Sequence, residues 1–482
     1  MTQKISVQEV AKSLNAQLFG KNSNAEVLDV THDSCQVVKG SLFVAICGLT
    51  VDGHRFVDDV MQRGAIGIIS ERHAPDNFQG VWFKVAGARE ALAKAAAAVH
   101  RNPSHHLKLI GITGTNGKTT TAYLCLQIAK SNGEKGAMLS TVEYRINEHS
   151  QLAILTTPEA CDTNRFLHKA LQENCEMAVM EASSQGIDAH RCDSLRFRIA
   201  IFTNLTCDHL DYHLTMENYF KAKSKLFDGS LGEMPASCVI NTDDEWGMKL
   251  QADYTAKDIE VSLVQGTSFI LHTSQGQRKV RSPLIGKPHV YNILAAIAAS
   301  IELGYDLNGI VEGLRTCTGA PGRFERVPHE GDFVVVIDYA HSEDALRNTL
   351  ETARDLTKNR IITVFGCGGD RDRGKRAPMG EMAGKYSDLV IITSDNCRTE
   401  DPLQIIREIE KGLRKTNCPY LKTPDRRDAI HQAISQAKRQ DIVLICGKGH
   451  ETYQVVGNNK FHFDDRQVAL EGIEKLSVKM MV

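Results

Sequence analysis

The stretch "LKLIGITGTNGKTTTAYLCLQIA", residues 107–129, contains an apolar strand-like run, a glycine-rich loop and a helix-like segment. Gly114 and Gly117 would let the loop turn tightly, so that backbone N–H groups point at phosphate oxygens. Lys118 would add a positive charge and Thr119 a hydroxyl for Mg²⁺. The strict phosphate-loop motif requires a glycine at position 112, where this chain has Ile112. An ordinary glycine-rich strand–helix turn is therefore the alternative. The flanking elements favour nucleotide binding by an α/β domain.

Toward the C-terminus, short apolar runs occur at 333–338, 361–366, 388–395 and 441–447, separated by helix-length segments. Continuous apolar strands joined by helices are typical of a parallel sheet covered on both faces. Ligands of such sheets bind at the carboxyl ends of the strands. Arg398 follows one of these runs, in "SDNCRTEDP" (394–402). It could form a surface ion pair with Glu400 or Asp401, or face the carboxylate of a ligand.

The segment "TNLTCDHLDYHLTMENYFKAKSKLF" (203–227) has an apolar stripe at helical spacing, with Lys223 in its middle. An ammonium on a buried face is costly unless it is paired or loses its charge. Lys223 could therefore extend to the rim or pair with a carboxylate such as Glu181. Alternatively, it could be a neutral amine with a chemical role. Glu181 also follows an apolar run and is a reasonable Mg²⁺ ligand.

A series of motifs occurs in one order along the chain: "GTNGKTTT", "TTPE", "MEASSQG", "FTNLTCDHLDYH", "YNILAAI", "PGRFE", "DYAH", "GCGGDRDRGKR", "DNCRTEDP" and "GKGHETYQ". Together they resemble the Mur ligase family over nearly the whole chain. The N-terminal "DSCQVVKGSLFVAICGLTVDGHRF" is similar to the uridine-nucleotide-binding domain of that family. An ordered series of this kind is far more specific than a phosphate loop alone.

The resemblance implies an α/β fold with three domains: a UDP-MurNAc-binding domain (1–104), a central ATP-binding phosphate-loop domain with a parallel-rich sheet (105–321), and a doubly wound, Rossmann-like amino-acid-binding domain (322–482). The implied activity is the ATP-dependent addition of meso-diaminopimelate to the D-Glu of UDP-MurNAc-L-Ala-D-Glu in peptidoglycan precursor synthesis. An acyl phosphate would be the intermediate and Mg²⁺ the cofactor. A homologous ligase that adds L-lysine or another amino acid is the alternative.

The matching motifs also imply roles for individual residues. The expected ATP contacts are Gly114, Thr115, Asn116, Gly117, Lys118, Thr119, Thr120, Asn292, Arg323 and Asp338. The expected contacts to the UDP-sugar dipeptide are Ser34, Thr156, Thr157, Ser183 and Arg191. The expected diaminopimelate contacts are Arg371, Asp395, Asn396, Arg398, Gly447 and Glu451. Thr119 would bind one Mg²⁺, Glu181 and His209 would hold a second Mg²⁺, and Lys223 would carry a carbamate. The expected catalytic residues are Lys118, Glu181, His209 and Lys223.

The chain departs from the family pattern at Cys35, Gln185, His289 and Cys397, where Arg, His, Asn and Pro are usual. Its formal net charge of −2 gives no electrostatic case for nucleic acid or an anionic membrane. The 13 cysteines show no metal-ligand spacing, and no long apolar run suggests a membrane span. We therefore expect a cytoplasmic protein, and we also expect it to act as a monomer. A nucleotide-dependent switch without ligase chemistry would be expected to lack Lys223, and the chain retains it.

Overall fold

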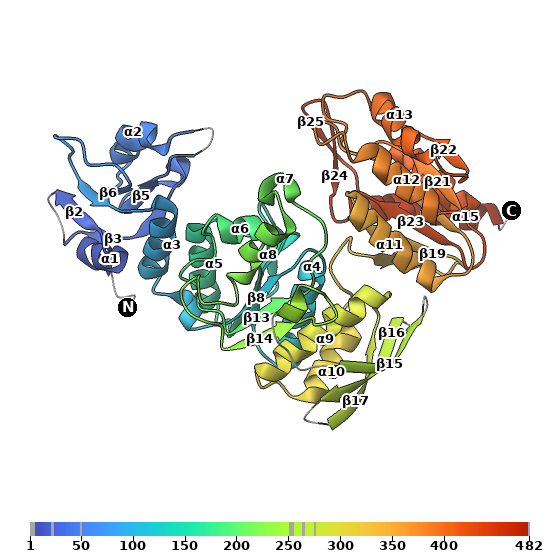
Figure 1. Cartoon of the computed structure of the whole chain (residues 1–482), viewed down its shortest axis with the longest axis horizontal. Coiled ribbons are helices and arrows are strands. Elements are labelled where there is room, and N and C mark those ends of the chain that lie inside the picture. Colours follow the sequence, from blue (N-terminus) through green and yellow to red (C-terminus); the bar gives the residue numbers. More distant parts are fainter. Residues whose placement is uncertain are drawn as a thin grey trace. The chain divides into compact units, whose positions relative to one another are not determined.

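The computed structural model describes residues 5–20, 24–48, 51–249, 255–262, 266–273 and 276–480. The chain divides into two compact units, the first made of Met1–Asp253 and Ala295–Gly313, and the second of Tyr254–Leu294 and Leu314–Val482. Figure 1 shows the elements of both units in sequence colours. Across the described ranges, no helix is both long and apolar enough to cross a lipid bilayer.

The first unit begins with a five-stranded sheet in the order β2-β7-β6-β5-β4. Its strands are β2 (Gln17–Gly20), β4 (Asp29–Thr31), β5 (Ser41–Ala45), β6 (Gly67–Ser70) and β7 (Val81–Lys84). Helices α1 (Val7–Leu14) and α3 (Ala88–Val99) pack on one face, and α2 (Val57–Gln62) packs on the other. The small pairing of β1 (Ile5–Ser6) with β3 (Glu26–Val27) and the short helices η1 (Ser34–Gln36) and η2 (Gly53–Phe56) complete this region.

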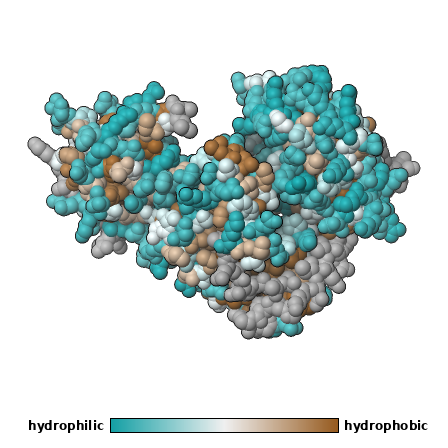
Figure 2. Space-filling model, viewed as in Figure 1, coloured by the Kyte–Doolittle hydropathy of each residue, from teal (hydrophilic) through white to brown (hydrophobic). Residues whose placement is uncertain are grey.

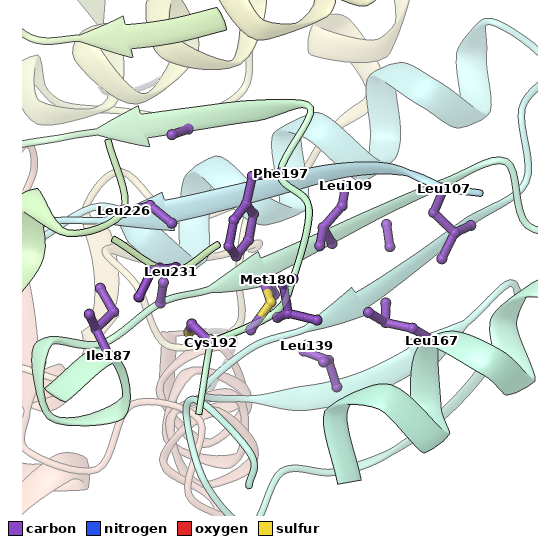
Figure 3. Close-up of a cluster of buried hydrophobic side chains, with 14 of the residues drawn as sticks. Leu107, Leu109, Leu139, Leu167, Met180, Ile187, Cys192, Phe197, Leu226 and Leu231 are labelled. Atoms are coloured by element: carbon purple, nitrogen blue, oxygen red, sulfur yellow. The ribbon is translucent and has the colours of Figure 1, made fainter. Parts of the chain in front are cut away.

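The same unit continues with a seven-stranded sheet in the order β11-β10-β9-β12-β8-β13-β14. Its strands are β8 (Lys108–Thr113), β9 (Gly136–Leu139), β10 (Glu143–Ile146), β11 (His149–Leu152), β12 (Met177–Glu181), β13 (Ile199–Phe202) and β14 (Ser237–Ile240). Its helices are α4 (Lys118–Ser131), α5 (Ala160–Gln172), α6 (Ser184–Asp188), α7 (Leu210–His213) and α8 (Met216–Ser224), with η3 (Pro103–His105) and η4 (Gly247–Lys249). In Figure 3, Leu109, Met180 and Phe197 gather in one buried cluster of this sheet.

Further elements link this region to the C-terminal sheet. They are β15 (Thr255–Ser262), β16 (Gly266–Thr273), β17 (Gly276–Ser282), α9 (Lys287–Glu302) and α10 (Leu307–Thr316). The three strands form an antiparallel sheet of their own. Most of the surface in Figure 2 is hydrophilic, with apolar atoms gathered over α7, next to which Leu214 is strongly exposed.

The second unit contains a six-stranded sheet in the order β18-β19-β23-β20-β21-β22. Its strands are β18 (Glu325–Val327), β19 (Val334–Asp338), β20 (Ile361–Phe365), β21 (Leu389–Ile392), β22 (Tyr420–Lys422) and β23 (Ile442–Cys446). All pairings except β18–β19 are parallel. One face carries α11 (Glu343–Leu356), α12 (Arg376–Tyr386) and α13 (Pro402–Leu413). The other face carries α14 (Arg426–Gln436) and α15 (Asp465–Met480). The strands β24 (Tyr453–Val456) and β25 (Asn459–His462) form a separate hairpin.

The expected fold class is therefore confirmed: both parallel-rich sheets are present, and the C-terminal one is covered by helices on both faces. The loops after β20, β21 and β23 leave the carboxyl edge of that sheet, where a ligand site was expected.

Candidate functional site

The phosphate loop joins β8 to α4 with a backbone that only glycine accommodates. Gly114 has φ +143°, and a Cβ there would lie 1.9 Å from Thr203 Oγ1. Gly117, with φ +88°, caps the N-terminus of α4. Thr119 and Thr120 are buried in the first turn of that helix. The loop thus places backbone N–H groups and a positive helix end at one spot, as anion binding requires.

The segment after β13 holds this loop in place. Asn204 accepts hydrogen bonds from the backbone N–H groups of Thr115, at its own backbone oxygen (2.9 Å), and of Asn116, at Oδ1 (2.9 Å). Thr203 Oγ1 donates to the backbone oxygen of Asn116 (2.6 Å). Sequence reasoning assigned no role to Thr203 or Asn204. The available signal was their position directly after the strand that pairs with β8.

Two lysines converge on the same loop. Lys118 Nζ donates to the backbone oxygens of Gly114 (2.9 Å) and Thr115 (2.8 Å). Lys223 Nζ donates to the backbone oxygen of Gly114 (2.8 Å) and lies over the ring of Tyr219. The positive charge of Lys118 beside a glycine-rich loop attracts an anion such as a polyphosphate.

Lys223 is 1% exposed, as the helical spacing predicted, although α8 itself ends at Ser224. Burial removes its ammonium from water and Lys118 repels it, so the pKa of Lys223 lies well below its ordinary value. Both ordinary alternatives are wrong: the side chain is not at the rim, and in the described structure Glu181 bonds elsewhere. The Glu181 carboxylate accepts from the backbone N–H (2.8 Å) and Oγ1 (3.0 Å) of Thr141.

His209 lies at the start of α7 with φ +54°. Burial lowers its pKa; Asp208 opposes this, and repulsion from Lys118 and Lys223 adds to it. The imidazole is therefore neutral near pH 7, which is the form that binds a metal ion. Among the described residues, no group of three or more His, Cys, Asp and Glu side chains could hold a metal by itself. A Mg²⁺ ion bound at Thr119, and a second one bound through Glu181 and His209, would each need further ligands from substrate or water, as is usual for Mg²⁺.

The residues expected to contact the UDP-sugar dipeptide lie around Glu181. Thr157 Oγ1 donates to the backbone oxygen of Glu181 (2.9 Å) and lies 2.9 Å from Ser183 Oγ. Arg191 Nη1 donates to the backbone oxygen of Thr157 (3.1 Å), while its buried Nε has no partner among the described residues. Thr156 Oγ1 lies 3.1 Å from Thr141 Oγ1, which bonds Glu181.

Ser34 belongs to η1, some distance along the chain from this group, but a cavity of about 960 Å³ connects the two regions. Ser34 and Asp33 line it from the N-terminal sheet, and Leu155, Pro158 and Glu159 line it next to Thr156 and Thr157. A volume of this size accommodates a large organic ligand.

His213 is a buried side chain outside the expected set of site residues. Its Nε2 lies 2.9 Å from Ser184 Oγ, and its ring packs against Tyr219 with centroids 5.1 Å apart. The Tyr219 hydroxyl lies 3.1 Å from Thr115 Oγ1 of the phosphate loop. His213 thus connects the "MEASSQG" loop to the phosphate loop through its ring contact with Tyr219. The sequence could not indicate this contact.

The remaining residues expected to contact ATP lie in the second unit. Asp338, at the end of β19, accepts from the backbone N–H groups of Phe324 (2.7 Å) and Ala340 (2.9 Å). Burial raises the pKa of Asp338, and the charge of Arg323 opposes that rise. Asn292 is buried on α9, with Nδ2 3.5 Å from His289 Nδ1. Asp338 and Arg323 are thus neighbours in this unit.

The residues expected to bind diaminopimelate meet at the carboxyl edge of the C-terminal sheet. Asn396 Nδ2 donates to Glu451 Oε2 (2.9 Å), which joins the loops after β21 and β23. Gly447 lies against Asp395, because a Cβ on Gly447 would be 3.3 Å from Asp395 Oδ2. Arg398 Nη1 donates to the backbone oxygens of Gly369 (2.8 Å) and Asn396 (3.4 Å).

Among the residues that the structure describes, Arg398 forms no ion pair with Glu400 or Asp401, so that alternative is wrong. Glu400 instead pairs with the fully buried Arg376 (2.9 Å), and Asp401 caps α13. The backbone of Arg398 bonds β24, donating to Val455 O (3.1 Å) and accepting from the N–H of Gly457 (2.7 Å). Arg371 is exposed and lies near Arg398, since a Cβ on Gly368 would be 3.1 Å from Arg398 Nη1 and 3.7 Å from Arg371 Cγ.

The four departures from the family pattern differ in their surroundings. Cys35 and Gln185 are exposed, and Cys35 lies in the same short helix as Ser34. His289 is buried, which lowers its pKa to about 4. Cys397 is buried beside Arg398, with Sγ 3.8 Å from Val455 O. The loop that carries Arg398 thus keeps its docking on β24 without a proline.

Comparison with known proteins agrees with this geometry. Three family models match along the chain: "Mur ligase family, catalytic domain" at residues 26–108, "Mur ligase middle domain" at 112–300, and "Mur ligase, glutamate ligase domain" at 322–449.

Among similar curated proteins, the "UDP-N-acetylmuramoyl-L-alanyl-D-glutamate--2,6-diaminopimelate ligase" of Solibacter usitatus (strain Ellin6076) is 44% identical, over 93% of this chain and 94% of its own length. The protein of the same name from Geobacillus thermodenitrificans (strain NG80-2) is 41% identical, over 94% and 96%. A solved structure with that name is 31% identical with a TM-score of 0.71, covering 98% of this chain and all of its own. The MurF ligase of Thermotoga maritima, solved with ADP, shares the fold at 20% identity and a TM-score of 0.62, over 94% and 98% of the two chains. The chain therefore belongs to the Mur ligase family.

Proposed function

We propose that the chain is an ATP-dependent ligase that joins meso-diaminopimelate to the D-Glu carboxyl of UDP-MurNAc-L-Ala-D-Glu, a step in peptidoglycan precursor synthesis. The printed names of its relatives support this reaction. The observation that carries the choice of amino acid is the cluster of Arg398, Asn396 and Glu451 at one sheet edge. We propose that it acts in the cytoplasm as a monomer without a nucleic-acid partner, in keeping with its net charge of −2.

The chemistry requires an activated carboxylate, because a free carboxylate is a poor electrophile. The D-Glu carboxylate attacks the γ-phosphorus of ATP, forming an acyl phosphate and releasing ADP. The unprotonated amine of the incoming amino acid then attacks the acyl carbon, and the tetrahedral intermediate expels inorganic phosphate. Lys118 offsets the repulsion between the anionic carboxylate and the triphosphate, and the backbone N–H groups in the first turn of α4 bind phosphate oxygens.

Thr119 would hold one Mg²⁺, and Glu181 and His209 would hold a second; bound Mg²⁺ would shield the negative charge of the phosphates. A hydroxyl at the first site, and a carboxylate with remaining lone pairs beside a neutral imidazole at the second, fit Mg²⁺ once substrate oxygens complete its ligands. We propose that Lys223 carries a carbamate. Its neutral amine bonds the carbon of CO₂ and a proton leaves to solvent, which converts the buried amine into an anion facing Lys118.

The amino-acid site matches a zwitterion that has an additional carboxylate. Arg398 and Arg371 would bind the distal carboxylate, and Glu451 would receive the distal ammonium. L-Lysine has no second α-carboxylate, so binding it would leave the charge of Arg398 desolvated without a carboxylate partner. A site built to pair a ligand group discriminates strongly against an analogue that lacks the group.

Phosphate release from ATP tests this proposal. The assay contains UDP-MurNAc-L-Ala-D-Glu with meso-diaminopimelate, with L-lysine or with no amino acid. We expect release only with meso-diaminopimelate, and formation of the corresponding tripeptide product by mass spectrometry. Release with L-lysine alone would identify the lysine-adding homologue instead. Absence of release in every reaction would contradict a ligase function altogether.

A further inference from the structure

We infer that Lys448 is a positioning residue of the amino-acid site, whose buried ammonium holds Asn396 and Glu451 in the arrangement that receives the incoming diamino acid. The inference rests on the proposed function and adds to it a residue that no motif assignment used. Lys448 lies in the turn after β23, between Gly447 and Gly449, both of which have positive φ.

The lysine is fully buried, with 0% of its side chain exposed. Nζ donates to Asn396 Oδ1 (3.2 Å), Glu451 Oε2 (3.2 Å) and Asp395 Oδ1 (3.4 Å). A buried ammonium persists only where such partners compensate for the loss of water. All three partners belong to the predicted diaminopimelate site, so the partners that stabilise Lys448 are the residues that would bind the ligand.

These contacts fix the orientation of the Asn396 side chain. The backbone N–H of Val455 donates to Oδ1 (2.9 Å), and Lys448 donates to the same oxygen. With its oxygen committed on that side, the amide directs Nδ2 at Glu451 Oε2 (2.9 Å). Lys448 therefore sets the amide orientation that Glu451 depends on.

The same contacts determine which carboxylate oxygen of Glu451 is available to a ligand. Oε2 accepts from both Lys448 and Asn396. Within the described ranges, Oε1 accepts no hydrogen bond and can receive a ligand ammonium. Asp395 and Glu451 share the single charge of Lys448, so the cluster retains attraction for a cation beside the guanidinium of Arg398. A neutral side chain at position 448 would leave two carboxylates without their shared counter-charge.

Steady-state kinetics of Lys448→Met, Lys448→Gln and Lys448→Arg test this inference. We expect the two neutral variants to raise the KM for meso-diaminopimelate by about 10- to 100-fold, since hydrogen bonds to charged groups are lost. The KM for the UDP-sugar dipeptide should stay within about twofold, because its expected contact residues belong to the first unit. The arginine variant keeps the charge and should recover part of the affinity.

Lys415→Met is the matched control, because Lys415 forms an exposed ion pair with Glu381 (2.8 Å) in the same unit. An unchanged KM for meso-diaminopimelate in folded neutral variants would overturn the inference. So would a loss of folding in both neutral variants, since Lys448 would then be a structural residue. Failure of the proposed function has a different result: the wild-type protein itself would show no phosphate release dependent on diaminopimelate.

Discussion

Lys223 is a buried amine whose only charged neighbour on the phosphate loop is another lysine. Its Nζ bonds Gly114 O and its pKa is strongly lowered. An amine with a strongly lowered pKa is a poor structural cation, but its neutral form can react with CO₂. Its burial followed from helical spacing in the sequence, because a period of 3.6 residues fixes which side chains share a face. The hydrogen bond from Lys223 to Gly114 could not be predicted in this way, because 109 residues separate the pair and only the fold brings them together.

We predict that Lys223→Ala abolishes ligase turnover and that added bicarbonate does not restore it. The substitution removes the amine that would carry the carbamate, whereas the phosphate loop keeps its bonds to Thr203 and Asn204. Turnover is measured by phosphate release, and nucleotide binding by calorimetric titration. Lys221→Ala is the control, since Lys221 is exposed on the same helix. Turnover of Lys223→Ala near the wild-type rate would show that the carbamate proposal is wrong.

At the scale of elements, the loops after β20 and β21 are joined by one buried arginine. Arg376 is 0% exposed and donates to Glu400 Oε1 (2.9 Å) and Oε2 (3.0 Å), and also to Glu408 Oε2 (2.7 Å). Hydrogen bonding from Arg376 lowers the pKa of Glu400 to about 2. The motifs "GCGGDRDRGKR" and "DNCRTEDP" are therefore parts of one structure that directs Arg398 at the site.

Glu400→Gln should loosen this junction. We expect the KM for meso-diaminopimelate to rise roughly threefold to tenfold, the equivalent of about 1 kcal/mol, because Arg398 loses the support of its loop. Near pH 6, wild type should also unfold at a higher denaturant concentration than Glu400→Gln. The folded-state pKa of Glu400 lies below its unfolded value of 4.5, so its contribution is complete above that value and is lost toward pH 2.

The stability difference between wild type and Glu400→Gln should therefore shrink as the pH falls from 5 toward 3, as measured by denaturant titration. Asp401→Glu is a useful control, because it keeps a carboxylate at the start of α13 outside the Arg376 cluster. A KM unchanged by Glu400→Gln would mean that the loop directs Arg398 without help from Arg376.

The elements that sequence patterns predicted are those with continuous apolar runs. The strands β19, β20, β21 and β23 lie within the expected ranges and pair in parallel. The hairpin of β24 and β25 was not predicted, because each strand has only four residues and none of them is buried. That hairpin nevertheless bonds the backbone of Arg398. Site residues could thus be assigned to a sheet edge from the sequence, but the element that orients one of them could not.

At the scale of the whole molecule, the ordered motifs predicted the family and the fold. Buried ion pairs between elements distant in the sequence are visible only in the structure. Arg426 and Asp465 are both 0% exposed and pair at 2.6 Å at the starts of α14 and α15. Arg426 also donates to the backbone oxygens of Cys446 (3.0 Å) and Ser394 (3.5 Å), at the ends of β23 and β21. No spacing rule indicated this pair, because its members lie on different helices 39 residues apart.

We predict that calorimetry resolves more than one unfolding transition and that Asp465→Asn lowers only one of them. Each compact unit has its own buried clusters, so each can lose its structure cooperatively. Breaking one partner of a buried ion pair costs about 3–5 kcal/mol, which shifts a transition of this size by roughly 10 °C. Arg407→Gln should move neither transition measurably, because its pair with Asp401 is exposed on both sides. A single transition that shifts as a whole in Asp465→Asn would show that the two units unfold together, and the separate cores would then not act as independent folding units.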